Sequence, residues 1–354
     1  MGSKALTILK YLLTLIVGIG LLWYLVNSQG PVAKANIIKG FENANYNWIF
    51  LTVIIAILEK VVRAYRWNLL LEPTKHKPPF KNTFLALIMG YFANTFAPRM
   101  GEVARCYILK KSDDVPVETS FGTVVAERAV DTICLLLLIP IALLLEYSII
   151  MDMLQKAWIQ ISDTVSKSYW IGIAGLVLLA GATSLLLYFR KKIKNNAFFI
   201  KIENFVQGLI QSILSIRKID KKGQFVICSV AIWVCYFFMT YIAFFALEAT
   251  SGLSLTAGLI ILIGGGMGMA APVQAGVGAF HYMVSEILMN VYSVSKDWAL
   301  PYAFLVWGSQ TATILVAGFA AWILILMLDK KKNLTLDNAD LQENTRSRKP
   351  EAIS

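Results

Sequence analysis

The chain has 354 residues, of which 57% are apolar and 16% are charged, and its formal net charge is +11 at pH 7. Soluble domains carry about 25% charged residues, so a water-soluble fold has too little polar surface to cover these apolar side chains, whereas a bilayer faces them with lipid. The basic residues stand in short clusters between apolar runs, as in the loops of membrane proteins, and no nucleic-acid-binding pattern accompanies them. We therefore expect an all-α polytopic membrane protein that binds no nucleic acid.

The cysteines and histidines do not indicate a metal site or a disulfide framework. The four cysteines are Cys106, Cys134, Cys228 and Cys235, and the two histidines are His76 and His281. Their spacing matches no metal-binding pattern. We expect no metal and no cofactor, and the longest stretches that are not apolar are too short for a catalytic domain.

Six apolar segments are long enough to cross the roughly 30 Å of hydrocarbon in a bilayer. The second of them is expected to continue as a helix past Arg63 and Arg66 to Leu71. The six predicted spans are Thr7–Val26, Tyr46–Val62, Thr123–Glu146, Tyr169–Phe189, Phe225–Leu247 and Tyr302–Leu328.

Two shorter apolar segments differ from the spans because each ends at a proline that is soon followed by a glycine. Thr83–Ala97 runs into Pro98, and Thr256–Ala271 runs into Pro272. Such breaks persist at membrane depth only where they pack in protein or line a cavity. We expect each segment to form a re-entrant helical hairpin with the apolar stretch that follows it. The predicted hairpins comprise residues 83–111 and 256–292.

The distribution of basic residues orients the chain. With a cytoplasmic N-terminus and two hairpins that return to the side they came from, most of the 33 Lys and Arg residues fall on the cytoplasmic side. Treating both hairpins as full spans would place the basic tract Arg190–Lys222 outside, against the positive-inside rule. We therefore expect a multi-pass protein of the bacterial cytoplasmic (inner) membrane with both termini in the cytoplasm.

This topology divides the chain into two units of opposite orientation, each with two spans, a hairpin and a third span. Inverted repeats of this kind are common in transporters. The predicted fold is thus six full spans plus two oppositely oriented re-entrant hairpins in an inverted repeat. The predicted units are 1–146 (first repeat), 147–189 (outer loop and first span of the second repeat), 190–224 (basic cytoplasmic amphipathic segment), 225–328 (remainder of the second repeat) and 329–354 (flexible cytoplasmic tail).

Ionisable residues inside apolar segments are costly and are therefore candidates for function. Glu127 and Asp131 share a helical face, and Arg128 can pair with Asp131 at a spacing of three. The surplus of arginine suits an anion, particularly a phosphate. The alternative is that these acids and arginines only neutralise one another. The candidate anion-binding residues are Arg99, Glu102, Arg105, Glu127, Arg128 and Asp131, and the residues expected to support them at the inner end of the second span are Glu59, Arg63 and Arg66.

The second break carries no charge, and a run of glycines precedes it at Gly264–Gly266. Close helix packing accounts for such small residues. The functional alternative is a polar groove that opens from the outer side, in which Glu286 is a candidate partner of His281. The residues expected to line the cavity are Asn94, Pro98, Pro272, Gln274, Gly276 and His281.

Three motifs resemble one known family over nearly the whole chain. They are GYFANTFAPRMGEVAR at Gly90–Arg105, AERAVD at Ala126–Asp131 and PVQAGVG at Pro272–Gly278. They resemble the flippase-like transmembrane domain of lysylphosphatidylglycerol synthases, as a stand-alone member without the soluble aminoacyl-transferase domain. Where that family usually has a charged Arg-Glu pair after the third motif, this chain has Ala279-Phe280-His281.

The resemblance implies a domain that moves a modified phospholipid between leaflets, with the charged residues of the first two motifs on the path of the head group. We expect translocation of an anionic or aminoacylated phospholipid, or of a lipid-linked intermediate, and no lysyltransferase activity. The expected partners are membrane lipids, with a lipid-modifying enzyme or glycosyltransferase as a candidate. The alternatives are a channel or small-solute transporter with aquaporin-like hairpins, and a membrane partner of such an enzyme that transports nothing itself.

Overall fold

The computed structural model describes residues 33–97, 99–147, 219–271 and 273–347, together with scattered positions between Ile16 and Asn27. Within these ranges all regular structure is helical, with ten α-helices, two short 3-10 helices and no strand. The prediction of an all-α chain is therefore confirmed for the described part. The predicted span Tyr169–Phe189, nearly all of the basic segment 190–224, and most of Thr7–Val26 lie outside it.

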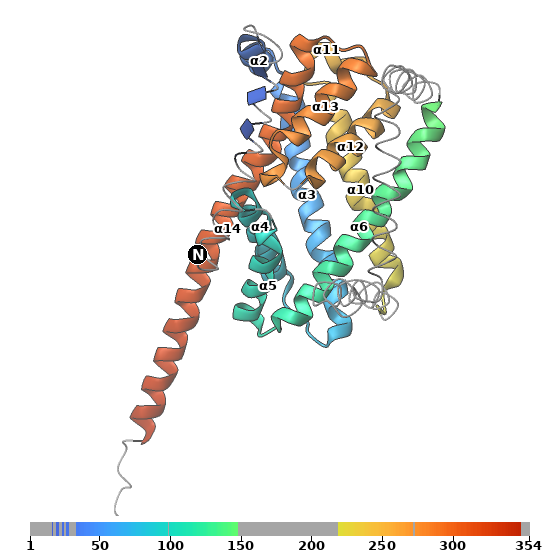
Figure 1. Cartoon of the computed structure of the whole chain (residues 1–354). Coiled ribbons are helices and arrows are strands. Elements are labelled where there is room, and N and C mark those ends of the chain that lie inside the picture. Colours follow the sequence, from blue (N-terminus) through green and yellow to red (C-terminus); the bar gives the residue numbers. More distant parts are fainter. Residues whose placement is uncertain are drawn as a thin grey trace, which may run out of the picture.

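Four long helices form the frame of the bundle: α3 (Tyr46–Leu71), α6 (Val117–Leu145), α10 (Lys222–Phe244) and α14 (Lys296–Ser347). Helices α3 and α10 pack along one another near the centre, and α6 crosses beside them (Figure 1). Of the described helices, α10 and the Lys296–Leu328 part of α14 meet the length and composition needed to cross a bilayer. Four of the six predicted spans coincide with these four helices. Two of the four, α10 and α14, are clear candidates for crossing a membrane.

Two helical hairpins complete the bundle. The first pairs α4 (Phe80–Phe96) with α5 (Met100–Asp113), and the second pairs α12 (Leu255–Ala270) with α13 (Ala279–Asn290). Figure 1 shows the α4–α5 hairpin in the lower half of the bundle and the α12–α13 hairpin in the upper half. The two pairs of helices lie close to the predicted bounds 83–111 and 256–292, and their re-entrant course through a membrane stays a prediction.

Glycines let the helices of each hairpin approach closely. A Cβ atom on Gly101 of α5 would clash with the carbonyl oxygen of Gly90 on α4, and one on Gly268 of α12 would lie 2.7 Å from the Cα atom of Phe280 on α13. The first turn is also fixed by Asn94, whose Oδ1 accepts a 2.7 Å hydrogen bond from the Gly101 N–H. The glycines of both hairpins therefore serve close packing.

The turns of the two hairpins contact each other. The Nε2 of Gln274, in the 3-10 helix η3 (Gln274–Gly276), donates a 3.1 Å hydrogen bond to the carbonyl oxygen of Phe96 at the end of α4. Trp307 on α14 fixes the same turn, because its Nε1 donates to the Ala275 carbonyl at 2.8 Å. Pro98 and Pro272, predicted to lie at these tips, fall outside the described residues.

Three short helices lie at the ends of the bundle: α2 (Ala33–Glu42), the 3-10 helix η1 (Glu72–Thr74) and α11 (Glu248–Ser251). Prolines set the start of two longer helices, since Pro79 precedes α4 and Pro116 precedes α6. Helix α14 continues as far as Ser347. The tail from residue 329, predicted to be flexible, is therefore helical over most of its length.

The outer faces of the long helices are apolar and exposed. Large exposed side chains include Leu136, Leu137 and Leu144 on α6, Val226, Ile227 and Val230 on α10, and Val316, Phe319 and Trp322 on α14. Polar side chains are instead buried between the helices, where Glu59, Arg63, Arg66, Arg105 and Glu127 are among the most enclosed residues of the described chain. This arrangement reverses the usual distribution in a soluble protein, where charged residues are almost never fully buried unless they are paired.

Candidate functional site

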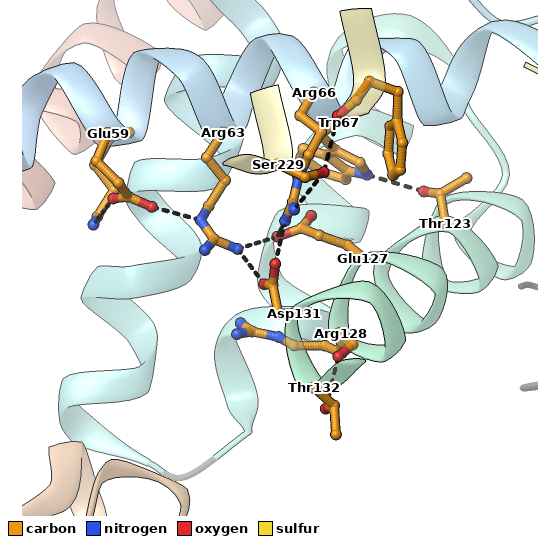
Figure 2. A network of polar contacts seen from close by, with 12 residues as sticks. Glu59, Arg63, Arg66, Trp67, Thr123, Glu127, Arg128, Asp131, Thr132 and Ser229 are labelled. Carbon is orange, nitrogen blue, oxygen red and sulfur yellow. Dashed lines mark hydrogen bonds and ion pairs between the residues drawn. The ribbon is translucent and has the colours of Figure 1, made fainter. Parts of the chain in front are cut away.

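The second half of α3 turns three charged side chains into the bundle. Glu59, Arg63 and Arg66 are spaced by four and three residues, which places them on one face of the helix, and each is at most 1% exposed. This face meets α6 and α10, as Figure 2 shows. The residues predicted to give inner-end support therefore lie at the centre of the polar network.

Arg63 links three helices through its guanidinium group. Its Nε donates to Glu59 Oε1 at 2.8 Å within α3. Its Nη1 donates to Glu127 Oε1 and to Asp131 Oδ2 on α6, both at 2.7 Å, and its Nη2 donates to the Tyr236 hydroxyl on α10, also at 2.7 Å. Every nitrogen of Arg63 is thus engaged, which indicates a structural rather than a ligand-binding role for this side chain.

Arg66 makes a second link between the same helices. Its Nη2 donates to Asp131 Oδ1 at 2.7 Å, and its Nη1 contacts the Ser229 hydroxyl on α10 at 3.3 Å. Asp131 therefore accepts from both arginines of α3, one on each carboxylate oxygen. Its side chain is 16% exposed, so it lies at the edge of the network.

Glu127 is the point where the arginines of two helices meet. Besides Arg63, its carboxylate accepts a 3.1 Å hydrogen bond from Nη1 of Arg105 on α5, and Arg66 Nη2 lies 3.8 Å away. The guanidinium of Arg105 lies over the ring of Trp67, 4.6 Å from its centroid, and Trp67 Nε1 donates to the Thr123 hydroxyl at 2.9 Å. A cation over a tryptophan face is attracted by the ring, so Trp67 helps to hold Arg105 in place.

Lys60 completes the network at the other end. Its ammonium group pairs with Glu59 and lies 4.5 Å from the centroid of the Tyr91 ring on α4. The network, defined by its ion pairs within the described residues, therefore contains three carboxylates and four cations, a surplus of one positive charge. Its members are Glu59, Lys60, Arg63, Arg66, Arg105, Glu127 and Asp131.

Two buried guanidinium nitrogens of the network have no hydrogen-bond partner in the described part of the chain. They are Arg66 Nε and Arg105 Nη2. A buried donor without an acceptor costs about 1–3 kcal/mol, and more when it is charged. The network consequently has both a surplus positive charge and free donors, the two features that an anion would satisfy.

The other predicted anion-binding residues lie outside this network. Arg128 pairs with Glu102 at 3.2 Å rather than with Asp131, and its side chain is 45% exposed. Arg99 is exposed, precedes α5 in a left-handed conformation with φ of 63°, and forms no ion pair with any described residue. The structure thus divides the six predicted residues into a buried group, Arg105, Glu127 and Asp131, and a more exposed group, Arg99 and Glu102 near the α4–α5 turn with Arg128 on α6.

The polar residues of the second hairpin do not join the network. His281 is fully buried between aromatic rings, 4.3 Å from Phe304 and 5.2 Å from Trp307 by ring centroids. Neither ring nitrogen has a partner among the described residues. The predicted pairing with Glu286 is wrong, since Glu286 accepts instead from Asn290.

The sequence pattern of the family described as "Lysylphosphatidylglycerol synthase TM region" matches residues 11–318. The chain belongs to this family. All seven members of the buried network lie inside the matched region. A UPF0104 membrane protein of Methanocaldococcus jannaschii is 38% identical over 99 residues, which cover 27% of this chain and 30% of that relative. The match therefore spans less than a third of the relative's length. No solved structure matches the chain.

Sequence reasoning missed the uncharged residues that orient the network in this member of the family. Trp67, Tyr236 and Ser229 each contact one of its arginines. Trp67 directly follows Arg66 in the sequence and so lies on the adjoining helical face. This position is the sequence feature that could have indicated its contact with the network. Tyr236 and Ser229 lie on α10, more than 150 residues from their arginine partners, and no local pattern predicts that pairing.

Proposed function

We propose that this chain is a multi-pass membrane protein in which α3, α6, α10 and α14 cross the bilayer. Membership of a transmembrane-region family supports this, as do the exposed apolar faces of α6, α10 and α14. Helix α3 fits the same role although its second half is charged, because those charges point into the bundle. In a bilayer, charged side chains are placed toward the bundle interior and paired with one another.

We also propose that the two hairpins are re-entrant and that the chain is an inverted repeat. The described part of each half contains a long helix, a hairpin and a second long helix, and the hairpins occupy opposite halves of the bundle (Figure 1). Their turns meet through Gln274 and Phe96. Opposed broken helices that meet inside a bundle are the arrangement in which many transporters place their substrate.

The lysines favour one orientation in the membrane. Lys75 and Lys77 lie between α3 and α4, Lys81 is in the first turn of α4, Lys110 and Lys111 are in the last turn of α5, and Lys221 and Lys222 stand at the start of α10. These segments are at one end of the bundle, since Lys221 contacts Glu72 at 3.9 Å and Asn82 bonds Asp113 at 2.9 Å. The positive-inside rule assigns this end to the cytoplasm.

The function that this arrangement best supports is translocation of a phospholipid, or of a lipid-linked intermediate, between the leaflets of the cytoplasmic membrane. The observation that carries the proposal is the buried network with one surplus positive charge inside helices that are apolar outside. Such a network lowers the cost of moving a charged head group through the membrane, while the acyl chains stay in lipid. Arginine suits this role because its planar fork binds phosphate oxygens in pairs.

Reconstitution of the full chain in vesicles tests the proposal. Vesicles are prepared with fluorescent phospholipids in both leaflets, and a reagent that cannot cross the membrane quenches only the outer ones. Translocation predicts that quenching proceeds beyond the outer-leaflet half in vesicles that contain the protein. Quenching that stops at the same level as in protein-free vesicles, for anionic, neutral and aminoacylated lipids alike, would contradict it and favour a partner that transports nothing.

A further inference from the structure

We propose that the buried network is matched to a head group with one net negative charge on a phosphodiester, and that it disfavours aminoacylated lipids whose head group is cationic. This inference deepens the proposed function and rests on it. It selects between the anionic and the aminoacylated lipids that the proposed function leaves open.

The preference for an anionic head group follows first from the charge balance of the network. Glu59, Glu127 and Asp131 face the cations Lys60, Arg63, Arg66 and Arg105. Arginines do not lose their proton in proteins, and every carboxylate of the network accepts a hydrogen bond from at least one of its cations. An uncompensated charge inside a protein is costly. A single negative charge neutralises the surplus, whereas a cationic head group would raise it to two.

The preference for a phosphodiester follows from the donor nitrogens that lack a partner. Arg66 Nε and Arg105 Nη2 are buried and unpartnered, and both guanidinium groups approach the same carboxylate of Glu127. The N–H groups on Arg66 Nε and Arg105 Nη2 therefore have no acceptor among the described residues, and a bound anion can supply one. The non-bridging oxygens of a phosphodiester accept hydrogen bonds from such donors, while an ammonium group offers only further donors.

An unpartnered acceptor on the same helix as Arg105 does not reverse this preference. Glu102 Oε2 is buried without a hydrogen-bond partner, but the charge of Glu102 is already matched by Arg128 at 3.2 Å. Glu102 and Arg105 are three residues apart on α5, which makes them neighbours on its surface. A neutral hydroxyl next to the phosphate can donate to this oxygen without adding charge, so a phosphodiester of a polyol satisfies both groups.

Binding to the purified full chain tests the inference without requiring transport. Thermal unfolding in detergent is measured with equal concentrations of phosphatidylglycerol (net charge −1), phosphatidylethanolamine (net charge zero) and lysylphosphatidylglycerol (net charge +1). A ligand that binds only the folded state raises the unfolding temperature. We expect the largest rise with phosphatidylglycerol and the smallest with lysylphosphatidylglycerol. An equal or larger rise with the lysyl lipid would overturn the inference.

A variant that removes one positive charge from the network provides a stricter test. Lys60→Gln removes the surplus charge, so the preference for phosphatidylglycerol over phosphatidylethanolamine should fall about tenfold in affinity. Lys81→Gln makes the same chemical change at an exposed lysine outside the network and should keep the preference. An unchanged preference in folded Lys60→Gln protein would overturn the inference. If that variant does not fold, the comparison of lipids on the unaltered chain still decides.

Further measurements distinguish binding of a lipid from binding of a free phosphodiester. They also distinguish failure of this inference from failure of the proposed function. Dimethyl phosphate carries the same single charge without acyl chains, and stabilisation by it but not by phosphatidylglycerol would overturn the assignment to a lipid. Preferential binding of phosphatidylglycerol without movement in vesicles would support the charge match and contradict only the proposed function. Faster movement of the lysyl lipid than of phosphatidylglycerol would support the proposed function and overturn this inference.

Discussion

Arg63 on α3 and Glu127 on α6 are 64 positions apart in the sequence and form a fully buried 2.7 Å ion pair. Around this pair, three arginines from two helices converge on one carboxylate. Asp131 lies at the edge of the network, where it accepts from Arg63 and Arg66 (Figure 2). The pair thereby fixes the relative position of α3 and α6. Arg66 and Arg105 each keep one donor nitrogen without a hydrogen-bond partner among the described residues.

Glu127→Gln should destabilise the protein strongly, because three arginines lose the charge that they share. Removal of one partner of a buried ion pair costs about 3–5 kcal/mol. Unfolding of the purified protein by a denaturing detergent measures the effect. Glu118→Gln is the matched control, since Glu118 is exposed in the first turn of the same helix. Equal stability of the two variants would contradict the central position of Glu127.

Gly101→Ala should disrupt the first hairpin, because the added methyl group would clash with the Gly90 carbonyl oxygen. Overpacking of this kind typically costs about 1–3 kcal/mol. Gly122→Ala in α6 is the control, since no atom lies within 4 Å of the added Cβ, and it should be neutral or stabilising. Thermal unfolding of both variants checks this, and a Gly101→Ala protein as stable as the Gly122→Ala protein would show that α4 and α5 do not pack this closely.

The proposed topology predicts that Ser112 and Ser295 face opposite sides of the membrane. Both are exposed, Ser112 near the end of α5 and Ser295 just before α14. A cysteine at position 295 should react with an impermeant thiol reagent added to intact cells, and one at position 112 should react only after the membrane is opened. The chain without its native cysteines serves as the background. Labelling of position 112 but not 295 in intact cells would exclude the orientation with the lysine-rich end inside.

The hairpins were predictable from the sequence, whereas the connections of the charged network were not. Proline and glycine interrupt the apolar segments near Pro98 and Pro272, and these interruptions predicted both pairs of helices within a few residues of their observed ends. The spacing of Glu127 and Asp131 likewise gave their shared face. Which arginine each acid would bind depends on how α3 packs against α5 and α6, and this is a tertiary property that spacing does not encode. Arg128 shows the difference, because local spacing favours Asp131 and packing selects Glu102.

The central claim is that the network binds the head group during translocation, and a charge-conserving substitution of Arg105 tests it most directly. Arg105→Lys keeps the positive charge beside Glu127 but loses the planar fork and its free Nη2 donor. Arg99→Lys makes the same change at the exposed turn, and Lys81→Arg is the reverse exchange outside the network. Lipid movement in vesicles is compared at equal amounts of folded protein.

We predict that Arg105→Lys moves fluorescent phospholipid at least about tenfold more slowly than the unaltered chain, as expected for the loss of one charged hydrogen bond of about 1.5–3 kcal/mol. Lys81→Arg should leave the rate unchanged. If Arg105→Lys moves lipid at the unaltered rate, the network does not bind the head group and its charges only neutralise one another.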